Sequence, residues 1–415
     1  MISKLHPFKS IYEQYVEDAS FMWVLRSIAV TQPHYTSADI AELEGRLEKY
    51  LDGIQTAPEL GWELCLEAAE FEQGGEAFCT AVTAFRSLEI EKIRVAVEIG
   101  FKNAETFKGL VSAFGWLPGK LIQPWIKKFF TSKDVRHKRL AVAACSVRRE
   151  NPLEYLTRIF AREDCIENRA LHIRSLRLVG ELKRHDLIPS LEYARASDDD
   201  EIRFWALWSS ILLGNRALAP ELEPFVICPN VNQQRAIQLA FRCLAISKAR
   251  DWITKLSADE SQVRNVLKAS GVLGDPQAIG WLITHMRNPK LARLAGEAFS
   301  LITGIDLEAN QLVIEIPDLD EQLPDDEPGD DNVEMDEDEN LPWPDADALT
   351  ITWQKYGNKF VCGNRYFMGK AIGQEPLVTQ LGNMTQRQLH EAAIEAALMN
   401  PSLVLSNTYK RVLDH

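Results

Sequence analysis

The sequence predicts an all-α protein, an α-solenoid in which helix pairs stack into a right-handed superhelix. One observation is a period, because arginines recur every 29–34 residues through the middle of the chain, at Arg139, Arg169, Arg203, Arg235, Arg264 and Arg293. A second is that each arginine precedes an Ala/Leu-rich apolar stretch, and three of these stretches reach a glycine 11 residues after the arginine. A fixed period of this size is typical of a repeat array, in which each unit packs on its neighbours.

The recurring arginine falls near the start of the first helix of each predicted pair. We interpret it as structural, a side chain that bonds a carbonyl or an Asp or Glu of the adjacent turn. The alternative is a ladder of guanidinium groups for an acidic ligand, which requires five or six of them to be open to solvent. A repeat array also favours an extended binding surface over an enzyme pocket.

Residues 1–130 are predicted to form a helical N-terminal region. Pro33 breaks its first helical stretch, and Ser37 is the expected N-cap of the next one, which carries apolar residues at helical spacing.

Residues 131–308 are predicted to form the repeat array itself. Each pair has an Ala-rich first helix with the arginine and a shorter second helix. In one junction Gly274 is expected to end a helix in the left-handed conformation, Asp275 to cap the next helix and Pro276 to begin it.

Residues 309–340 are predicted to be a flexible acidic linker. From residue 318 to residue 347 there are 15 Asp or Glu and no Lys or Arg, so this stretch accounts for nearly all of the net charge of −14. Its few apolar residues cannot offset the entropy cost of ordering. Three interpretations stay open: a solvated linker, loose cation binding without the ligand order of an EF-hand, and contact with a basic patch of a partner.

Candidate partner-binding residues follow from the third interpretation and from a turn near the N-terminus. In the linker they are Asp325, Asp326, Glu327, Asp330, Asp331, Glu334, Asp336, Glu337, Asp338 and Glu339. His34 and Tyr35 complete the set, and a purely structural turn is the alternative for this pair.

Residues 341–415 are predicted to cap the array. Asp347–Trp353 is expected to begin a helix, and the stretch from Arg365 is expected to form a short strand or an extended docking segment. An amphipathic helix is predicted to follow Thr385, its expected N-cap, and to stop at Pro401.

Composition and motifs argue against several classes of function. Outside the acidic stretch the charges nearly balance and no basic stripe stands out, so nucleic-acid binding is not expected. The N-terminus lacks a signal-peptide core and no long apolar run occurs, which indicates a cytoplasmic protein that does not bind a membrane. The seven cysteines and eight histidines show no metal-ligand spacing, and no nucleophile or phosphate-loop motif occurs. We therefore expect no catalytic residues, no cofactor and no metal.

One repeat junction resembles the HEAT-like repeats named after phycobilisome (PBS) lyases. The matching residues are Val263, Arg264, Leu273, Gly274, Asp275, Pro276 and Ala278. The resemblance implies HEAT-like helix pairs and carries almost no information on activity.

Both ends of the chain resemble an uncharacterised bacterial family that contains these repeats. The N-terminal match includes Phe21, Trp23, Arg26, His34, Tyr35 and Trp62, and the C-terminal match includes Pro342, Pro344, Trp353, Arg365 and Tyr366. Members of that family are often encoded near type VI secretion genes. The resemblance therefore implies a partner such as a secreted effector or toxin, with the chain acting as an adaptor or an immunity protein.

The function expected from the sequence is a non-enzymatic protein-binding scaffold. The alternative from another class is an enzyme, of the bilin-lyase type or another small-ligand handler. An enzyme requires a deep polar pocket with clustered acids or nucleophiles, whereas a binding module requires a long continuous surface.

Overall fold

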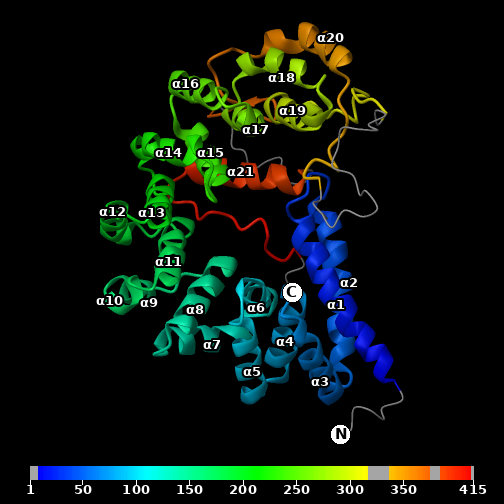
Figure 1. Cartoon of the computed structure of the whole chain (residues 1–415), viewed down its shortest axis with the longest axis vertical. Helices are drawn as coiled ribbons and strands as arrows, with labels where there is room; N and C mark the ends of the chain where they lie inside the picture. The colour runs from blue at the N-terminus through cyan, green and yellow to red at the C-terminus, as the bar shows by residue number, and fades with distance from the viewer. Residues whose placement is uncertain (1–7, 316–335, 374–383, 413–415) are drawn as a thin grey trace. The chain divides into compact units, whose positions relative to one another are not determined.

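The computed structural model describes residues 8–315, 336–373 and 384–412, and helices make up most of that part of the chain (Figure 1). The fold is all-α, as the sequence predicts. The right-handed superhelical twist stays a prediction. The chain forms two compact units, which are described separately. Unit 1 comprises residues 1–213, 382–393 and 401–415, and unit 2 comprises residues 214–381 and 394–400.

Unit 1 is built from antiparallel and stacked helices. Its helical segments are α1 (Lys9–Ala29), α2 (Ser37–Gln55), α3 (Pro58–Ala68), η2 (Ala69–Phe71), α4 (Gly74–Ser87), α5 (Ile90–Gly100), α6 (Ala104–Trp116), α7 (Gly119–Thr131), α8 (Val135–Arg148), α9 (Glu154–Phe160), α10 (Glu163–Ile166), α11 (Arg169–Glu181), η3 (His185–Leu187), α12 (Ile188–Arg195) and α13 (Asp200–Leu212). Helices α4, α6, α8, α11 and α13 each pack on the next, and this row forms the central stack of unit 1 (Figure 1).

The start of α2 differs by one residue from the sequence expectation. Thr36, not Ser37, is the N-cap, and it forms a capping box with Asp39. The Thr36 amide donates to Asp39 Oδ2 at 2.8 Å, while the Asp39 amide donates to Thr36 Oγ1 at 3.4 Å. Each side chain thus satisfies a main-chain donor that the helix itself leaves open.

A glycine sets the distance between α11 and α13. Gly180 lies inside the last turn of α11 and does not end the helix, although the apolar stretch after Arg169 reaches this glycine at its end. A Cβ at this position would come within 2.7 Å of Ser209 Cα, a main-chain atom of α13. Ser209 Oγ donates to the carbonyl of Leu176 at 2.7 Å. The two helices therefore approach closely because position 180 has no side chain.

Unit 2 continues with shorter helices and one small hairpin. Its segments are η4 (Arg216–Leu222), α14 (Glu223–Ile227), α15 (Gln233–Cys243), α16 (Ile246–Leu256), η5 (Glu260–Gln262), α17 (Val263–Leu273), η6 (Pro276–Ala278), α18 (Ile279–His285), α19 (Pro289–Thr303), α20 (Ala346–Tyr356), η7 (Gly357–Lys359), β1 (Tyr366–Phe367) and β2 (Lys370–Ala371). Helix α17 packs on both α15 and α19. The predicted helix at 347–353 is confirmed as α20, and the stretch after Arg365 forms the antiparallel hairpin.

The α17–α18 junction follows the sequence prediction. Gly274 ends α17 with φ +72°, Asp275 caps the following turn and Pro276 begins it. Gly274 also contacts the hairpin, because the Tyr366 amide donates to the Gly274 carbonyl at 2.8 Å. A Cβ there would lie 2.1 Å from the Tyr366 carbonyl oxygen, so only glycine fits this junction.

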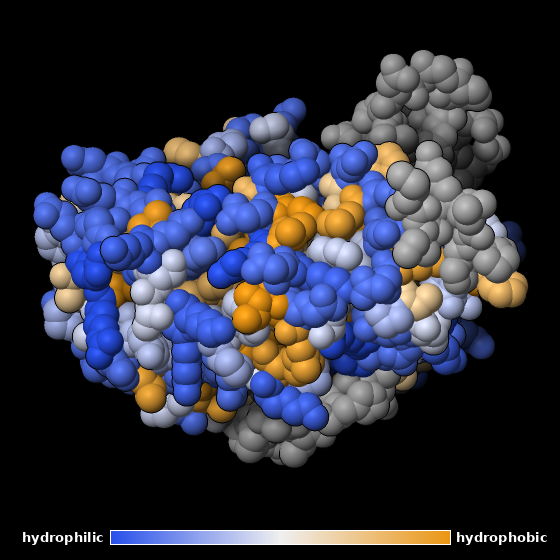
Figure 2. Space-filling view, turned by 90° about the horizontal axis from the view of Figure 1, so that it is seen from below, coloured by the Kyte–Doolittle hydropathy of each residue, from blue (hydrophilic) through white to orange (hydrophobic). Residues whose placement is uncertain are grey.

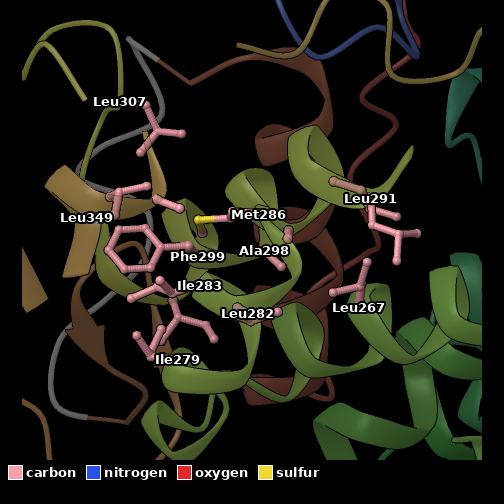
Figure 3. Close-up of a cluster of buried hydrophobic side chains, with 14 of the residues drawn as sticks. Leu267, Ile279, Leu282, Ile283, Met286, Leu291, Ala298, Phe299, Leu307 and Leu349 are labelled. Atoms are coloured by element: carbon pink, nitrogen blue, oxygen red, sulfur yellow. The ribbon is translucent and has the colours of Figure 1, made fainter. Parts of the chain in front are cut away.

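The core of unit 2 gathers side chains from α18, α19 and α20 (Figure 3). Ile283 of α18, Met286 directly after it, Phe299 of α19 and Leu349 of α20 belong to one buried cluster. Phe299 and Leu349 are fully buried. This cluster fixes α20, so the chain that follows the acidic segment is part of unit 2's core.

Helix α21 (Gln386–Met399) contributes its first residues to unit 1 and its last residues to unit 2. It confirms the amphipathic helix predicted in this region. The two compact units divide after residue 213, and the predicted boundaries at residues 130, 308 and 340 stay predictions.

Candidate binding surface of unit 1

The C-terminal strap, defined here as residues 401–412, runs along unit 1 without helical structure. Arg26 of α1 holds one end of it, since its Nη2 donates to the carbonyls of Tyr409 and Lys410 at 3.0 and 3.1 Å. Arg26 is itself fixed by Glu44 of α2 at 2.9 Å, and both side chains are almost fully buried. The pair therefore orients a cation toward main-chain oxygens of the strap.

The middle of the strap is held in the same manner by α8 and α11. Arg149 Nε donates to the Leu405 carbonyl at 2.6 Å, and the Leu405 amide donates to the Glu181 carbonyl at 3.0 Å. Asn407 Nδ2 donates to the Val147 carbonyl at 2.7 Å. Most of these bonds use the strap's main chain, so this surface holds an extended segment largely independently of its side chains.

A cavity of about 330 Å³ lies between the strap and the helices behind it. It is lined by Gly115, Val147, Arg148, Arg149, Val404, Leu405, Ser406, Asn407, Lys410 and Arg411. The charged side chains of this lining are all cationic. Within the described residues, Glu150 pairs with Arg148 at 2.8 Å and Glu48 pairs with Arg411 at 3.3 Å, so carboxylates behind the lining neutralise part of the charge.

Beside this cavity lies the arginine cluster, defined as Arg139, Arg149, Arg174 and Arg177. Arg174 and Arg177 share a face of α11 with Glu181, because residues three, four and seven positions apart align on a helix. Glu181 is fully buried. Its Oε1 accepts from Arg177 Nε at 2.8 Å, and its Oε2 accepts from Ser146 Oγ and lies 3.2 Å from Arg149 Nη1. One carboxylate thus serves two arginines and a hydroxyl.

The electrostatics of the cluster are unbalanced. Burial alone raises the pKa of Glu181, but Arg177, Arg149 and Arg174 outweigh it and lower that pKa to about 2. Burial, followed by repulsion from Arg177, lowers the pKa of Arg174 to about 9, and Arg149 and Arg139 add to the repulsion. Arg149, Arg174 and Arg177 therefore act on one buried carboxylate, and Arg139 adds to the repulsion on Arg174.

Two members of the cluster form no hydrogen bond or ion pair with a carboxylate in the described part of the chain. Among the residues that the structure describes, no hydrogen bond or ion pair is found for Arg174, which is partly buried. Arg139 lies over the Phe107 ring at 4.1 Å, and burial lowers its pKa. Arg177 stacks over Trp205 at 5.0 Å. Aromatic faces attract guanidinium groups but do not neutralise them.

The other recurring arginines all bond an oxygen, as the structural interpretation expects. Arg169 pairs with Asp199 and Glu201 of the next helix pair, and Arg203 donates to the Ser197 carbonyl at 3.0 Å. Arg235 donates to the Val231 carbonyl at 3.4 Å. Arg139 is the exception within the described residues.

In unit 2 the arginines of α17 and α19 bind the acidic segment. Arg264 donates to both carboxylate oxygens of Asp338 at 2.7 and 3.0 Å, Lys268 lies 3.3 Å from Glu337, and Arg293 pairs with Asp336. Asp338 is almost fully buried. Three of the predicted partner-binding carboxylates thus form ion pairs inside unit 2.

The remaining predicted binding residues are placed as follows. Glu339 is exposed at the surface of unit 2. Asp325, Asp326, Glu327, Asp330, Asp331 and Glu334 lie outside the described residues. His34 is exposed with its ring 4.4 Å from that of Tyr35, and the Tyr35 carbonyl accepts from the Gln386 amide at 2.8 Å. The turn at His34 therefore has a structural contact with the start of α21.

Groups that could perform chemistry are dispersed in the described part of the chain. No group of three or more His, Cys, Asp or Glu side chains there is arranged to hold a metal ion. Cys65, Cys79, Cys145 and Cys165 are buried, and Cys228 and Cys362 are exposed. Burial raises the pKa of Cys65 and Cys145 to about 12, which disfavours the nucleophilic thiolate. None of the described helices is long and apolar enough to cross a bilayer.

The molecular surface also exposes some apolar side chains. Figure 2 shows a face on which hydrophilic residues predominate and hydrophobic residues gather in a few patches. On α1, Phe21, Val24 and Ile28 are 63%, 40% and 36% exposed and follow one another at helical spacing. An apolar helix face of this kind is typical of contact surfaces.

Sequence reasoning did not single out Arg149, Arg177 and Glu181. The available signal was the stretch "RALHIRSLRLVGE", in which charged residues fall at helical spacing within an apolar helix. Charged residues inside a buried stripe indicate an ion-pair network or a binding site.

No family model, no curated protein and no solved structure matches this chain.

Proposed function

We propose that the protein is a non-enzymatic helical-repeat scaffold that binds a protein partner on the surface of unit 1 beside the C-terminal strap. The observation that carries this proposal is the strap itself. Arg26, Arg149 and the Glu181 carbonyl hold an extended segment of chain mainly through its main-chain groups. A surface that holds one extended segment in this way suits a second one alongside it.

The positive charge of this surface favours an acidic partner. The cavity beside the strap and the adjacent arginine cluster both present cations, although the chain as a whole has a net charge of −14. The charges outside residues 318–347 nearly balance, so a local cationic patch orients an acidic partner and raises the association rate. The exposed apolar face of α1 supplies further contact area of the kind that stabilises interfaces.

The resemblance at the two ends of the chain gives the partner a candidate identity. If it holds, the partner is a type VI secretion effector or spike component in the cytoplasm, and the protein is a loading adaptor or an immunity protein. These two roles differ in outcome. Loss of an adaptor abolishes secretion of the effector, whereas loss of an immunity protein makes cells sensitive to a neighbouring toxin.

The test is affinity capture of partners by the tagged full-length protein, followed by reconstitution with purified components. We expect one protein to bind in a defined ratio. Replacing Arg26 with Gln frees two strap carbonyls and should weaken this complex, whereas Arg94→Gln, which changes an exposed side chain of α5, should not. Failure to reconstitute any captured protein with the purified chain would refute the proposed function.

A further inference from the structure

We propose that the arginine cluster of unit 1 is the binding site for an acidic, carboxylate-rich segment of a partner protein. This inference rests on the proposed function and names the chemistry of the partner at that surface. Three observations carry it: the charge of the cluster, the way unit 2 treats equivalent arginines, and the position of the cluster next to the strap.

The first observation is an excess of positive charge in a partly buried place. Arg149, Arg174 and Arg177 lie around Glu181, and Arg139 adds to the repulsion on Arg174. The oxygens of Glu181 are already occupied by Arg177, Arg149 and Ser146. Arg174 has no hydrogen-bond or ion-pair partner among the described residues, and Arg139 has only the Phe107 ring. Removing a guanidinium from water without an anion is unfavourable, so the cluster is incomplete as it stands.

The second observation is a precedent within the same chain. By the repeat period, Arg139 of α8 is the counterpart of Arg264 of α17 and Arg293 of α19. In unit 2 these two arginines bind Asp338 and Asp336, two carboxylates separated by one residue in a non-helical segment. The same type of helix row therefore binds an acidic turn segment in unit 2, whereas no hydrogen bond or ion pair is found for Arg139 of unit 1 among the residues that the structure describes.

The third observation is that an extended chain can reach the cluster. Arg149 belongs to both the cluster and the lining of the cavity beside the strap. Arg149 donates to a strap carbonyl and also contacts Glu181, so the surface that holds the strap adjoins the arginine cluster. A segment lying beside the strap would direct its carboxylates to Arg174 and Arg139.

The arrangement favours several carboxylates over one phosphoryl group. Arg139 and Arg149 belong to the α8 region and Arg174 and Arg177 to α11, and Arg149 and Arg177 already share Glu181. The unsatisfied groups, Arg174 and Arg139, thus lie on different helices. Side chains from alternate positions of an extended peptide suit such a pair, because they lie on one face of the peptide. In unit 2, Asp336 and Asp338 of a turn segment likewise reach arginines on two helices.

The experiment measures fluorescence anisotropy of a short fluorescein-labelled peptide of alternating Asp and Glu added to the full-length protein. We expect saturable binding that weakens as salt rises. Arg174→Gln and Arg139→Gln should each weaken binding about tenfold, the effect of losing one charge-assisted hydrogen bond. The matched control is Arg158→Gln, which removes one positive charge from an exposed side chain of α9 and should leave the affinity unchanged.

Several outcomes would overturn the inference. They are no binding by the wild-type protein, equal weakening by Arg158→Gln, or tight binding of inorganic phosphate with none of the acidic peptide. Thermal unfolding of each variant checks that it is folded, and Arg139→Gln provides a second variant should Arg174→Gln fail to fold. A partner that reconstitutes with wild type and Arg174→Gln equally would refute this inference and leave the proposed function standing.

Discussion

The two units of this protein use similar arginines in different ways. In unit 2, Arg264 and Arg293 pair with Asp338 and Asp336 of the acidic segment. In unit 1, Arg139 and Arg174 form no ion pair with a carboxylate among the described residues, and the buried Glu181 pairs with their neighbours Arg149 and Arg177. In unit 2 the charge is neutralised within the fold, as in a scaffold role, whereas in unit 1 it leaves room for the binding role that we propose.

The comparison also shows why the period alone does not reveal function. The period gives the place of each arginine along the row of helices. It does not give the ion-pair partner, which comes from whichever segment lies opposite. For Arg264 that segment is about 70 residues away in the sequence, and the pairing cannot be read from spacing.

The largest expected effect is at the centre of the unit 1 cluster. Glu181→Gln removes the carboxylate that pairs with Arg149 and Arg177, and the free energy of unfolding should fall by about 3–5 kcal/mol because these cations lose their buried counter-ion. Urea denaturation of the wild type and the variant measures this change in the free energy of unfolding. The control Glu154→Gln changes an exposed pair with an N–O distance of 3.7 Å and should cost less than about 0.5 kcal/mol. Equal losses for the two variants would remove the distinction between buried and exposed networks.

The same carboxylate makes unit 1 sensitive to acid. The pKa of Glu181 is lowered from 4.5 to about 2 in the folded protein, so its ionised form stabilises the fold above pH 4.5. That contribution, about 3 kcal/mol by linkage, is lost as the pH falls from 4.5 toward 2. The stability difference between wild type and Glu181→Gln should therefore narrow over this range. A constant difference from pH 7 to pH 3 would show that Glu181 acts through packing alone.

The sequence predicted the fold more completely than the site. Helices, the Gly274–Pro276 junction and the amphipathic helix before Pro401 depend on local periodicity and on turn residues, and the structure confirms them. The N-cap differed by one residue because Thr36 and Ser37 are both good caps, and only the Asp39 contact selects between them.

The candidate site could not be read from the chain because it depends on distant contacts. Arg149 meets Leu405, more than 250 residues away, and Arg26 meets Tyr409. The acidic residues selected as partner-binding were chosen by composition, yet Asp336 and Asp338 pair with arginines of their own unit. Charge density identifies groups that need a counter-ion and does not tell whether the fold already provides one.

An intermediate effect is expected in unit 2. Asp338→Asn should lower the free energy of unfolding by about 1–3 kcal/mol, because Asp338 is almost fully buried and accepts two hydrogen bonds from Arg264. Glu339→Gln, an exposed neighbour, is the control and should change stability by less than about 0.5 kcal/mol. A chemical denaturation curve that does not distinguish the two would mean that the acidic segment contributes little to unit 2.

The smallest effect is the sharpest test of the comparison. Arg264→Gln removes a paired cation and should destabilise by about 1 kcal/mol, whereas Arg174→Gln relieves repulsion and should leave stability unchanged or raise it slightly. The dependence of stability on pH independently shows whether the charge of Arg174 opposes folding. The folded pKa of Arg174 is lowered to about 9, so its charge opposes folding fully below pH 9 and less as the pH rises toward 12.5. The advantage of Arg174→Gln over wild type in thermal unfolding should shrink across that interval. If Arg174→Gln instead destabilises as much as Arg264→Gln at pH 7, Arg174 belongs to the scaffold, and the contrast between the two units disappears.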